Sequence, residues 1–263
     1  MCLKKENTSC VSNGDGSVST VTAADTDTAV DDAELARLTF ELLSGAGAEP
    51  LPRHRHQLSR DDVRRSQTAR ILAAAIELFG DRGYADTTVA QIADRAGVSR
   101  RTVYDLYDSK EAVFLHTYRC TQLLMMKGAG SVDDALERST LAVEDLPDAV
   151  RGLLSFIAAS PVAVRMFFLE ATGAGPRVRA RRNEAIAEFV SVIAPGLQRL
   201  RAAAEPTLPP LSVELCNAIV AAAIELVVQH LGRSEPESLT DIAPAVAELI
   251  RAVVAPNCAR VAS

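Results

Sequence analysis

Two local helix signals, close together in the chain, constrain its fold more than any other feature. Thr88-Val-Ala-Gln91 has the form of a capping box, in which the Thr88 hydroxyl accepts a hydrogen bond from a backbone N–H of the first turn and Gln91 reaches back. Gly97 then supplies the left-handed conformation that a sharp turn requires, and Ser99 is a good N-cap for the next helix. These signals predict two short helices joined by a tight turn.

The apolar positions agree with this prediction. They fall on one side of each short helix, at Ile92, Ala93 and Ala96 and then at Val103 and Leu106. Ala93 is small at a position where two helices that cross steeply must approach closely. This is the spacing of a helix-turn-helix, whose second helix lies in the major groove of DNA while the first crosses the backbone.

Helical spacing of apolar residues continues through the rest of the chain. One helix of about four turns begins near Arg64 and is closed by Gly80 and Gly83. The further helices are expected at about 88–96, 99–107, 109–126, 133–145, 148–159, 161–172, 177–204, 212–231 and 238–254. Because no stretch alternates with a period of two, the predicted fold class is all-α.

Proline and glycine mark the ends of these helices. Pro147 and Pro161 stand where the first turn of a helix tolerates a missing N–H, and Gly232 stands where a C-terminal cap is expected. Pro195 lies inside the long segment 177–204, so that helix is expected to kink or divide there.

Composition divides the chain into three parts. Residues 1–60 are expected to be a disordered or weakly structured extension and linker, because the first 30 residues have almost no large apolar side chains. Within it, Leu35, Leu38, Leu42 and Leu43 have the spacing of one amphipathic helix. Residues 61–120 form the predicted helix-turn-helix domain, and residues 121–263 form a helical regulatory and dimerisation domain.

Charge, cysteines and hydropathy restrict the environment of the protein. The net charge is −6, but residues 53–120 are net basic, with 12 Lys and Arg against 9 Asp and Glu. The five scattered cysteines have no metal-ligand spacing and indicate reduced thiols, with redox sensing by Cys120 or Cys216 as the alternative. We expect a soluble cytoplasmic protein with no membrane span, because Glu225 interrupts the longest apolar run, and with no secretory signal.

The residues around the helix-turn-helix resemble a known family. The run ILAAAIELFGDRGYADTTVAQIADRAGVSRRTVYDLYDSKEAVF, Ile71 to Phe114, resembles the N-terminal domain of TetR-family regulators. The matching positions are an Ala-rich helix that ends in Leu78-Phe79, then Gly83-Tyr84, Thr87-Thr88, Ile92-Ala93, Ala96 to Ser99, Thr102, Tyr104 and Ser109-Lys110-Glu111.

The resemblance implies a set of DNA contacts. Phosphate contacts are implied for Thr88, Tyr104 and Lys110, and contacts with base edges for Arg100, Arg101 and Thr102, with Ser99 on the same DNA-facing side. Arginine suits bidentate contact with guanine, and hydroxyl and amine groups suit phosphates. The alternative for the two arginines is a solvated helix face.

Asp105 and Leu106 depart from the residues found at these positions in many members of the family. Asp105 has the chemistry to accept a hydrogen bond from a cytosine amino group. The alternative, which we favour, is an ion pair with Arg101 one turn back.

The C-terminal domain resembles the regulatory domains of the same family, although more weakly. In such domains the last two helices pair with those of a second subunit, and small residues that would permit close approach are Ala218, Ala221, Ala222 and Ala223. A pocket for a small apolar molecule is expected between the preceding helices, with the candidate lining residues Phe156, Met166, Phe167 and Glu170. The alternative for both sets is ordinary packing within the subunit.

These features predict a homodimeric transcriptional regulator of double-stranded DNA. The expected form is a repressor released from a palindromic operator by a small-molecule effector, and the alternative is an activator or dual regulator of the same fold. A helical carrier or enzyme is disfavoured, because the four histidines form no spaced metal set and no nucleophile or phosphate-loop motif is present. No cofactor and no metal are expected. A DNA-bending protein would be strongly basic, and this chain is not.

Overall fold

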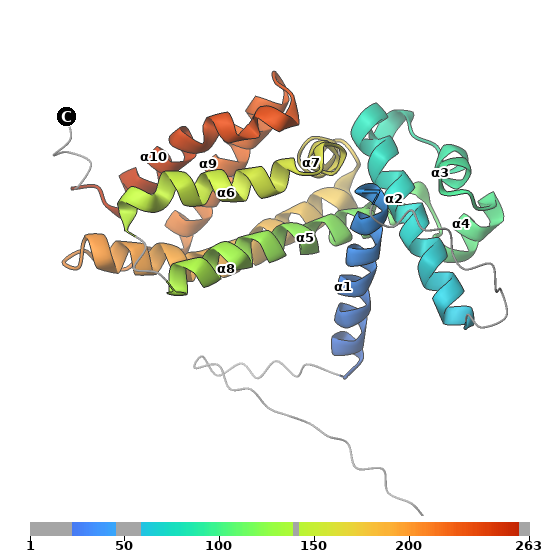
Figure 1. Cartoon of the computed structure of the whole chain (residues 1–263), viewed down its shortest axis with the longest axis horizontal. Coiled ribbons are helices and arrows are strands. Elements are labelled where there is room, and N and C mark those ends of the chain that lie inside the picture. Colours follow the sequence, from blue (N-terminus) through green and yellow to red (C-terminus); the bar gives the residue numbers. More distant parts are fainter. Residues whose placement is uncertain (1–22, 46–58, 139–141, 258–263) are drawn as a thin grey trace, which may run out of the picture.

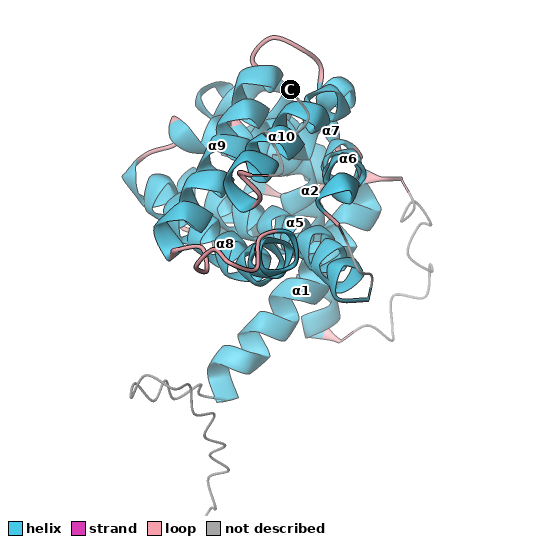
Figure 2. Cartoon of the chain, turned by 90° about the vertical axis from the view of Figure 1, so that its left-hand side faces the viewer, coloured by secondary structure: helices cyan, strands magenta, loops and turns pink. Residues whose placement is uncertain are grey.

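The computed structural model describes residues 23–45, 59–138 and 142–257, and every regular element in these ranges is helical (Figures 1 and 2). The all-α prediction is confirmed. The helices are α1 (Ala23–Leu43), α2 (Arg60–Asp86), α3 (Val89–Ala96), α4 (Arg100–Leu106), α5 (Lys110–Arg138), α6 (Leu146–Ala158), α7 (Pro161–Phe168), α8 (Pro176–Ala204), α9 (Val213–Leu231) and α10 (Ala243–Val254). Short 3₁₀ helices are η1 (Val143–Asp145), η2 (Glu170–Thr172) and η3 (Pro236–Ile242).

Most helix ends follow the sequence signals. Pro147 and Pro161 lie in the first turns of α6 and α7, and Gly232 is the C-cap of α9. Pro195, however, lies inside α8 without dividing it. Its ring is on an exposed face of the helix, so water can reach the carbonyl group that loses its hydrogen bond.

The helices pack around two hydrophobic cores. The first is built on α2, whose residues 71–76 are all buried, and it takes in α3, α4 and the first half of α5. The second lies among α6, α8, α9 and α10, with Met125 of α5 at its edge. Since α5 runs without a break from one core to the other, the domain boundary drawn at residue 120 falls inside a helix (Figure 1).

Part of the expected N-terminal extension is a packed helix. α1 lies against α2 and α5, and Leu35, Ala36 and Thr39 are 4%, 5% and 0% exposed. Residues 32–43 are therefore not a weakly structured extension, because their leucine stripe packs on an apolar surface formed by helices far away in the sequence. Residues 1–22 and 46–58, also assigned to the extension, lie outside the described residues.

The two cysteines within the described ranges are both buried free thiols. Cys120 is 0% exposed, and burial raises its pKa to about 12; the pKa of Cys216 is raised by the same cause. The thiolate is the reactive form of cysteine, so this burial opposes the redox-sensing alternative. Cys2, Cys10 and Cys258 lie outside the described residues.

α9 is unusually apolar for a helix with so much exposed surface. By length and composition it is the one described helix that could cross a membrane by itself. The prediction that Glu225 excludes a membrane-spanning helix here is therefore wrong. A single carboxylate does not offset a helix otherwise rich in Ala, Val, Leu and Ile. α9 packs against α8, α10 and η3, which is how a helix of a helical domain packs.

Candidate functional site

The helix-turn-helix begins with the capping box that the sequence predicts. The Thr88 hydroxyl accepts from the Gln91 backbone N–H at 3.3 Å, and the Gln91 side-chain oxygen accepts from the Thr88 backbone N–H at 2.8 Å. Two of the N–H groups that a helix start leaves without partners are thereby satisfied. This geometry fixes the first residue of α3 at Val89.

The turn between α3 and α4 is held by a residue that the sequence did not reveal. Gly97 adopts φ 63° and ψ 39°, the left-handed conformation expected of it. Arg70 on α2 donates from Nε to the Ala96 carbonyl at 2.9 Å and from a terminal nitrogen to the Gly97 carbonyl at 2.6 Å. Because these partners are 26 and 27 residues apart in the chain, no local pattern signals the contact.

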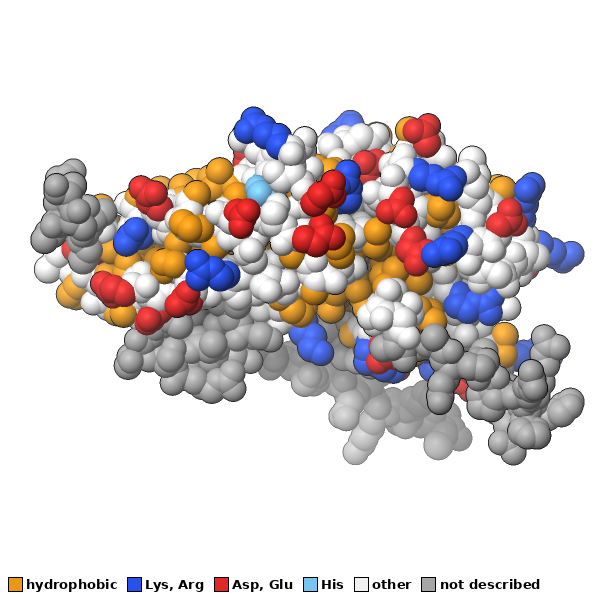
Figure 3. Space-filling view, turned by 45° about the horizontal axis from the view of Figure 1, so that its top comes forward, with side chains coloured by type: hydrophobic (Ala, Val, Ile, Leu, Met, Phe, Trp, Pro, Cys, Tyr) orange, Lys and Arg blue, Asp and Glu red, His pale blue; other side chains and the backbone are white. Residues whose placement is uncertain are grey.

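α4 presents one polar face to solvent. Val103 is its buried anchor at 1% exposed, while Arg100, Arg101 and Asp105 are exposed and Tyr104 is 58% exposed. Figure 3 shows Lys and Arg side chains at the right-hand end of the molecule, where this domain lies. A solvent-facing recognition helix with two arginines and a tyrosine has the chemistry for base and phosphate contacts.

The two hydroxyls at the start of α4 are bonded to each other. Ser99 accepts from the Thr102 backbone N–H at 3.0 Å, and the two side-chain oxygens lie 2.8 Å apart. Ser99 therefore serves first as the N-cap of α4. Its DNA contact and that of Thr102 remain predictions.

Asp105 and Arg101 lie on the same exposed face. Their nearest charged atoms are 4.0 Å apart, and the two side chains are 67% and 90% exposed. An ion pair this exposed is screened by water and contributes little to the stability of the fold. The favoured ion pair is present at long range, and it leaves the Arg101 guanidinium accessible.

Lys110 faces the protein and not the solvent side of the recognition helix. Its ammonium donates to the carbonyls of Tyr84 at 2.7 Å, Ala85 at 3.3 Å and Thr87 at 2.9 Å, and it lies 4.3 Å from the centre of the Tyr84 ring. An ammonium has three N–H donors, so all of them are used. Lys110 thus closes the C-terminal end of α2, and this geometry does not favour the predicted phosphate contact.

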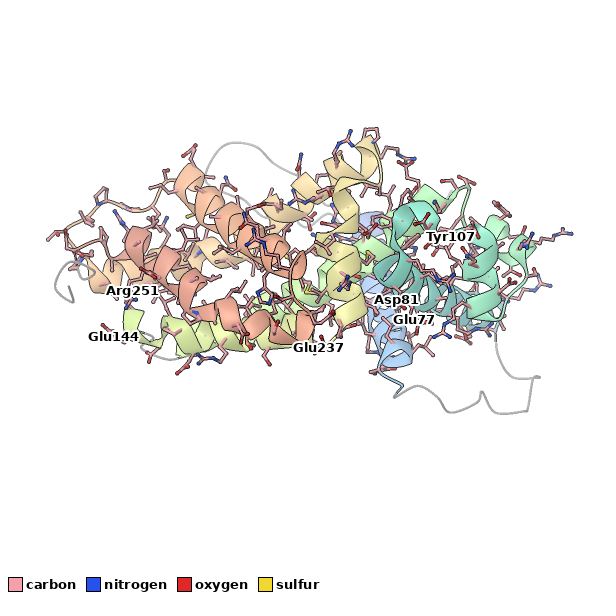
Figure 4. All side chains as sticks on the ribbon, turned by 90° about the horizontal axis from the view of Figure 1, so that it is seen from above. Glu77, Asp81, Tyr107, Glu144, Glu237 and Arg251 are labelled. Atoms are coloured by element: carbon pink, nitrogen blue, oxygen red, sulfur yellow. The ribbon has the colours of Figure 1, made fainter. Side chains whose placement is uncertain are left out.

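Tyr107 ends the recognition helix inside the domain (Figure 4). Its hydroxyl lies 2.8 Å from Nδ1 of His116, and burial raises its pKa. Tyr107 is 8% exposed, and the ring of Tyr84 contacts those of Phe79 and Phe114, so both tyrosines pack in the core of this domain.

This domain matches a known family. Residues 71–117 match the family of bacterial regulatory proteins, tetR family. The helix-turn-helix domain of this chain is therefore a tetR-family domain. The match covers α3, the turn and α4 together with most of α2 and the start of α5.

Two curated relatives carry the same kind of domain. The chain is 33% identical over 129 residues to the HTH-type transcriptional activator FasR of Mycolicibacterium smegmatis, which covers 49% of this chain and 56% of FasR. It is 30% identical over 76 residues to YezE of Bacillus subtilis, an uncharacterized HTH-type transcriptional regulator, which covers 26% of this chain and 39% of YezE. The matched part thus spans about half or less of these relatives.

Two solved structures share the fold over most of this chain. FadR from Bacillus subtilis, in complex with stearoyl-CoA, has a TM-score of 0.56 at 20% identity and covers 69% of this chain and 96% of that one. A TetR-family transcriptional regulator from Mesorhizobium loti has a TM-score of 0.57 at 18% identity, with 74% and 98% covered. These matches extend beyond the helix-turn-helix domain, so the helices that follow it are arranged as in these two structures.

The second domain contains an apolar cavity of about 140 Å³ that is partly open to solvent. Its walls come from α5, α6, α7, α8, α9 and α10, which Figure 2 shows grouped together. All lining residues are apolar except Tyr118, Gln122 and Arg182. Apolar cavities with few polar groups are typical of small-molecule sites.

Of the four residues predicted to line this cavity, only Phe167 does so. Phe156 is 40% exposed, because the cavity face of α6 carries its neighbour Ile157 and one residue turns a helix by about 100°. Met166 is fully buried in the first core instead. Glu170 accepts the Tyr84 backbone N–H at 2.7 Å and so ties η2 to the end of α2.

The four alanines of α9 divide between two faces. Ala218 and Ala221 are exposed, Ala222 is half-buried, and Ala223 lines the cavity. Val213 and Leu215, at the start of the same helix, are 68% and 44% exposed. The exposed face of α9 thus mixes small residues with the polar side chains of Glu214, Asn217, Glu225 and Gln229, whereas Ala223 points into its own subunit.

Proposed function

We propose that this chain is a TetR-family DNA-binding transcriptional regulator that acts in the cytoplasm as a homodimer on a palindromic operator. The observation that supports this best is the solvent-facing side of α4, where Arg100, Arg101 and Tyr104 are exposed on a helix whose caps and buried Val103 hold it in place. Half-sites for two such helices lie about 34 Å apart on B-DNA, one helical turn.

The homodimer would form through α9. Its exposed residues Ala218 and Ala221 permit close approach of a second helix, and Val213 and Leu215 add exposed apolar surface nearby. Association that buries this surface is favourable by about 25 cal/mol per Å² of apolar area. A dimer also supplies the second recognition helix that a palindrome requires.

The cavity is the proposed effector site. Phe167 belongs to its wall and also stacks on Tyr118 with ring centres 4.4 Å apart, so an effector contacts the helices that join the two domains. An effector that prefers one arrangement of the domains over the other changes operator affinity, and a tenfold change takes about 1.4 kcal/mol of coupling. We expect release of a repressor. The likeness to FasR, an activator, makes activation the second candidate.

DNA binding is tested by fluorescence anisotropy on the DNA upstream of the gene itself. We expect Arg100→Ala and Tyr104→Phe each to weaken binding, Arg100→Ala by about tenfold or more if it contacts a base. Arg151→Ala on exposed α6 is the matched control and should leave binding unchanged. Wild-type affinity in both recognition-helix variants would refute the site. Transcription from that promoter with and without the protein separates repression from activation.

A further inference from the structure

One arginine in the cavity wall has no acidic partner among the residues that the structure describes. Arg182 on α8 is half-buried, and no hydrogen bond or ion pair engages it there. The nearby carboxylates are used by others: Arg181 pairs with Glu184 and Glu188, each at 3.0 Å, and Glu188 also receives Arg119 at 3.2 Å.

An unpaired guanidinium beside an apolar wall is costly. Arginine stays charged at any physiological pH, and a charge that loses water without gaining a partner destabilises the protein. The same guanidinium is well suited to a carboxylate or phosphate, which it binds through two parallel N–H donors. The guanidinium group of Arg182 is therefore available to bind an anion.

Arg182 stands at one end of an apolar stripe. The lining residues of α8 share one helical face and are Arg182, Ala185, Ile186, Phe189, Ile193 and Leu197. From Arg182 to Leu197 the helix rises about 22 Å, which is room for an extended hydrocarbon chain. Beyond Arg182 every lining residue on this stripe is apolar.

The two other polar lining residues lie at the same end. Gln122 on α5 donates to Glu188 at 2.7 Å and accepts from Arg181, the sequence neighbour of Arg182. Tyr118 lies one turn earlier on α5, and within the described part of the chain its hydroxyl has no hydrogen-bond partner. Burial raises the pKa of Tyr118, and the positive charges of Arg182 and Arg181 oppose that rise, as expected of groups near each other.

We propose that the cavity binds a long aliphatic chain with an anionic head group, whose head is held by Arg182 with the Tyr118 hydroxyl beside it. This rests on the proposed function, since it identifies the effector class of the same cavity. A neutral apolar ligand would leave the arginine without a partner, and a wholly polar ligand would leave the apolar wall without contacts. The head is a carboxylate or a phosphate, as in a free fatty acid or an acyl-CoA.

Calorimetry with three probes of equal chain length tests the assignment. The probes are dodecanoate, dodecanoyl-CoA and 1-dodecanol, titrated into the wild-type protein, Arg182→Gln and Arg179→Gln. Arg179 is the matched control, because it is an exposed arginine one turn away on α8 that does not line the cavity. Operator binding of each protein without ligand is measured in parallel.

We expect the wild type to bind an anionic probe at least about tenfold more tightly than 1-dodecanol, as loss of one charged hydrogen bond implies. Arg182→Gln should lose this preference and keep its affinity for 1-dodecanol, and Arg179→Gln should match the wild type. Preference for dodecanoate identifies the carboxylate as the head, and preference for dodecanoyl-CoA alone identifies the phosphates.

Equal affinity of the wild type for all three probes would overturn the proposal, as would a preference that survives in Arg182→Gln. Failure of all three probes to bind a protein that binds operator DNA would refute this ligand class and leave the regulator in place. Loss of operator binding by the wild type would refute the proposed function instead.

Discussion

Replacing Lys110 by methionine separates its two possible roles. Methionine keeps an unbranched apolar side chain but removes the ammonium that donates to Tyr84, Ala85 and Thr87. These carbonyls belong to the end of α2, where helix geometry leaves carbonyl groups without partners and a positive charge is favourable. The substitution should therefore destabilise the junction of α2 with α3.

The magnitude follows from the contacts. Buried hydrogen bonds to a charged group are worth about 1.5–3 kcal/mol each, but Lys110 is only half-buried, so water replaces part of what is lost. Two short bonds at about 1 kcal/mol each and a cation–π contact of about 0.5 kcal/mol give a loss of about 2–3 kcal/mol in the free energy of unfolding.

Two measurements on Lys110→Met decide between the roles. Urea unfolding should show the lower stability, and the slope of log affinity for DNA against log salt should match the wild type. A phosphate contact would instead reduce the size of that slope by about 0.9 per subunit, or about 1.8 for the proposed dimer, and leave stability unchanged. Arg101→Gln is the control, since its 90% exposed side chain should affect DNA binding without affecting unfolding. Unchanged stability in Lys110→Met would refute the structural role.

Two further predictions concern single contacts. Gly97→Ala should lower the free energy of unfolding by about 1 kcal/mol in urea, because alanine is strained at φ 63°; Gly97→Asn should cost less, and equal stability of all three proteins would contradict the argument. Burial alone would raise the pKa of Glu188, but the hydrogen bond and charge of Arg181 outweigh it and hold the pKa below its ordinary 4.5. The ionised Glu188 carboxylate therefore stabilises the folded protein fully above pH 4.5. This stabilisation is lost as the pH falls through the lower pKa that Glu188 has in the folded state. Unfolding measured from neutral pH to below about 4 should show a smaller acid loss in Glu188→Gln than in the wild type, and identical acid profiles would exclude this role.

The helix-turn-helix was readable from the sequence because its signals are local. The capping box of Thr88 and Gln91, the left-handed Gly97 and the N-cap Ser99 each act within four residues of the chain. Helix ends and tight turns depend on such short-range hydrogen bonds and backbone preferences, so residue type and spacing suffice. The all-α class follows in the same way from apolar periodicity.

Only the tertiary structure decided which surfaces these helices meet. Periodicity shows that a residue faces a core, but not which core, so Phe167 was predicted to line the cavity together with Met166, which lies in the other core. Arg70 and Lys110 have partners more than 20 residues away in the chain, and Arg182 is notable only because its neighbours' carboxylates are already paired. Such contacts form between segments that local sequence does not relate, which is why the helix-turn-helix could be predicted and the cavity chemistry could not.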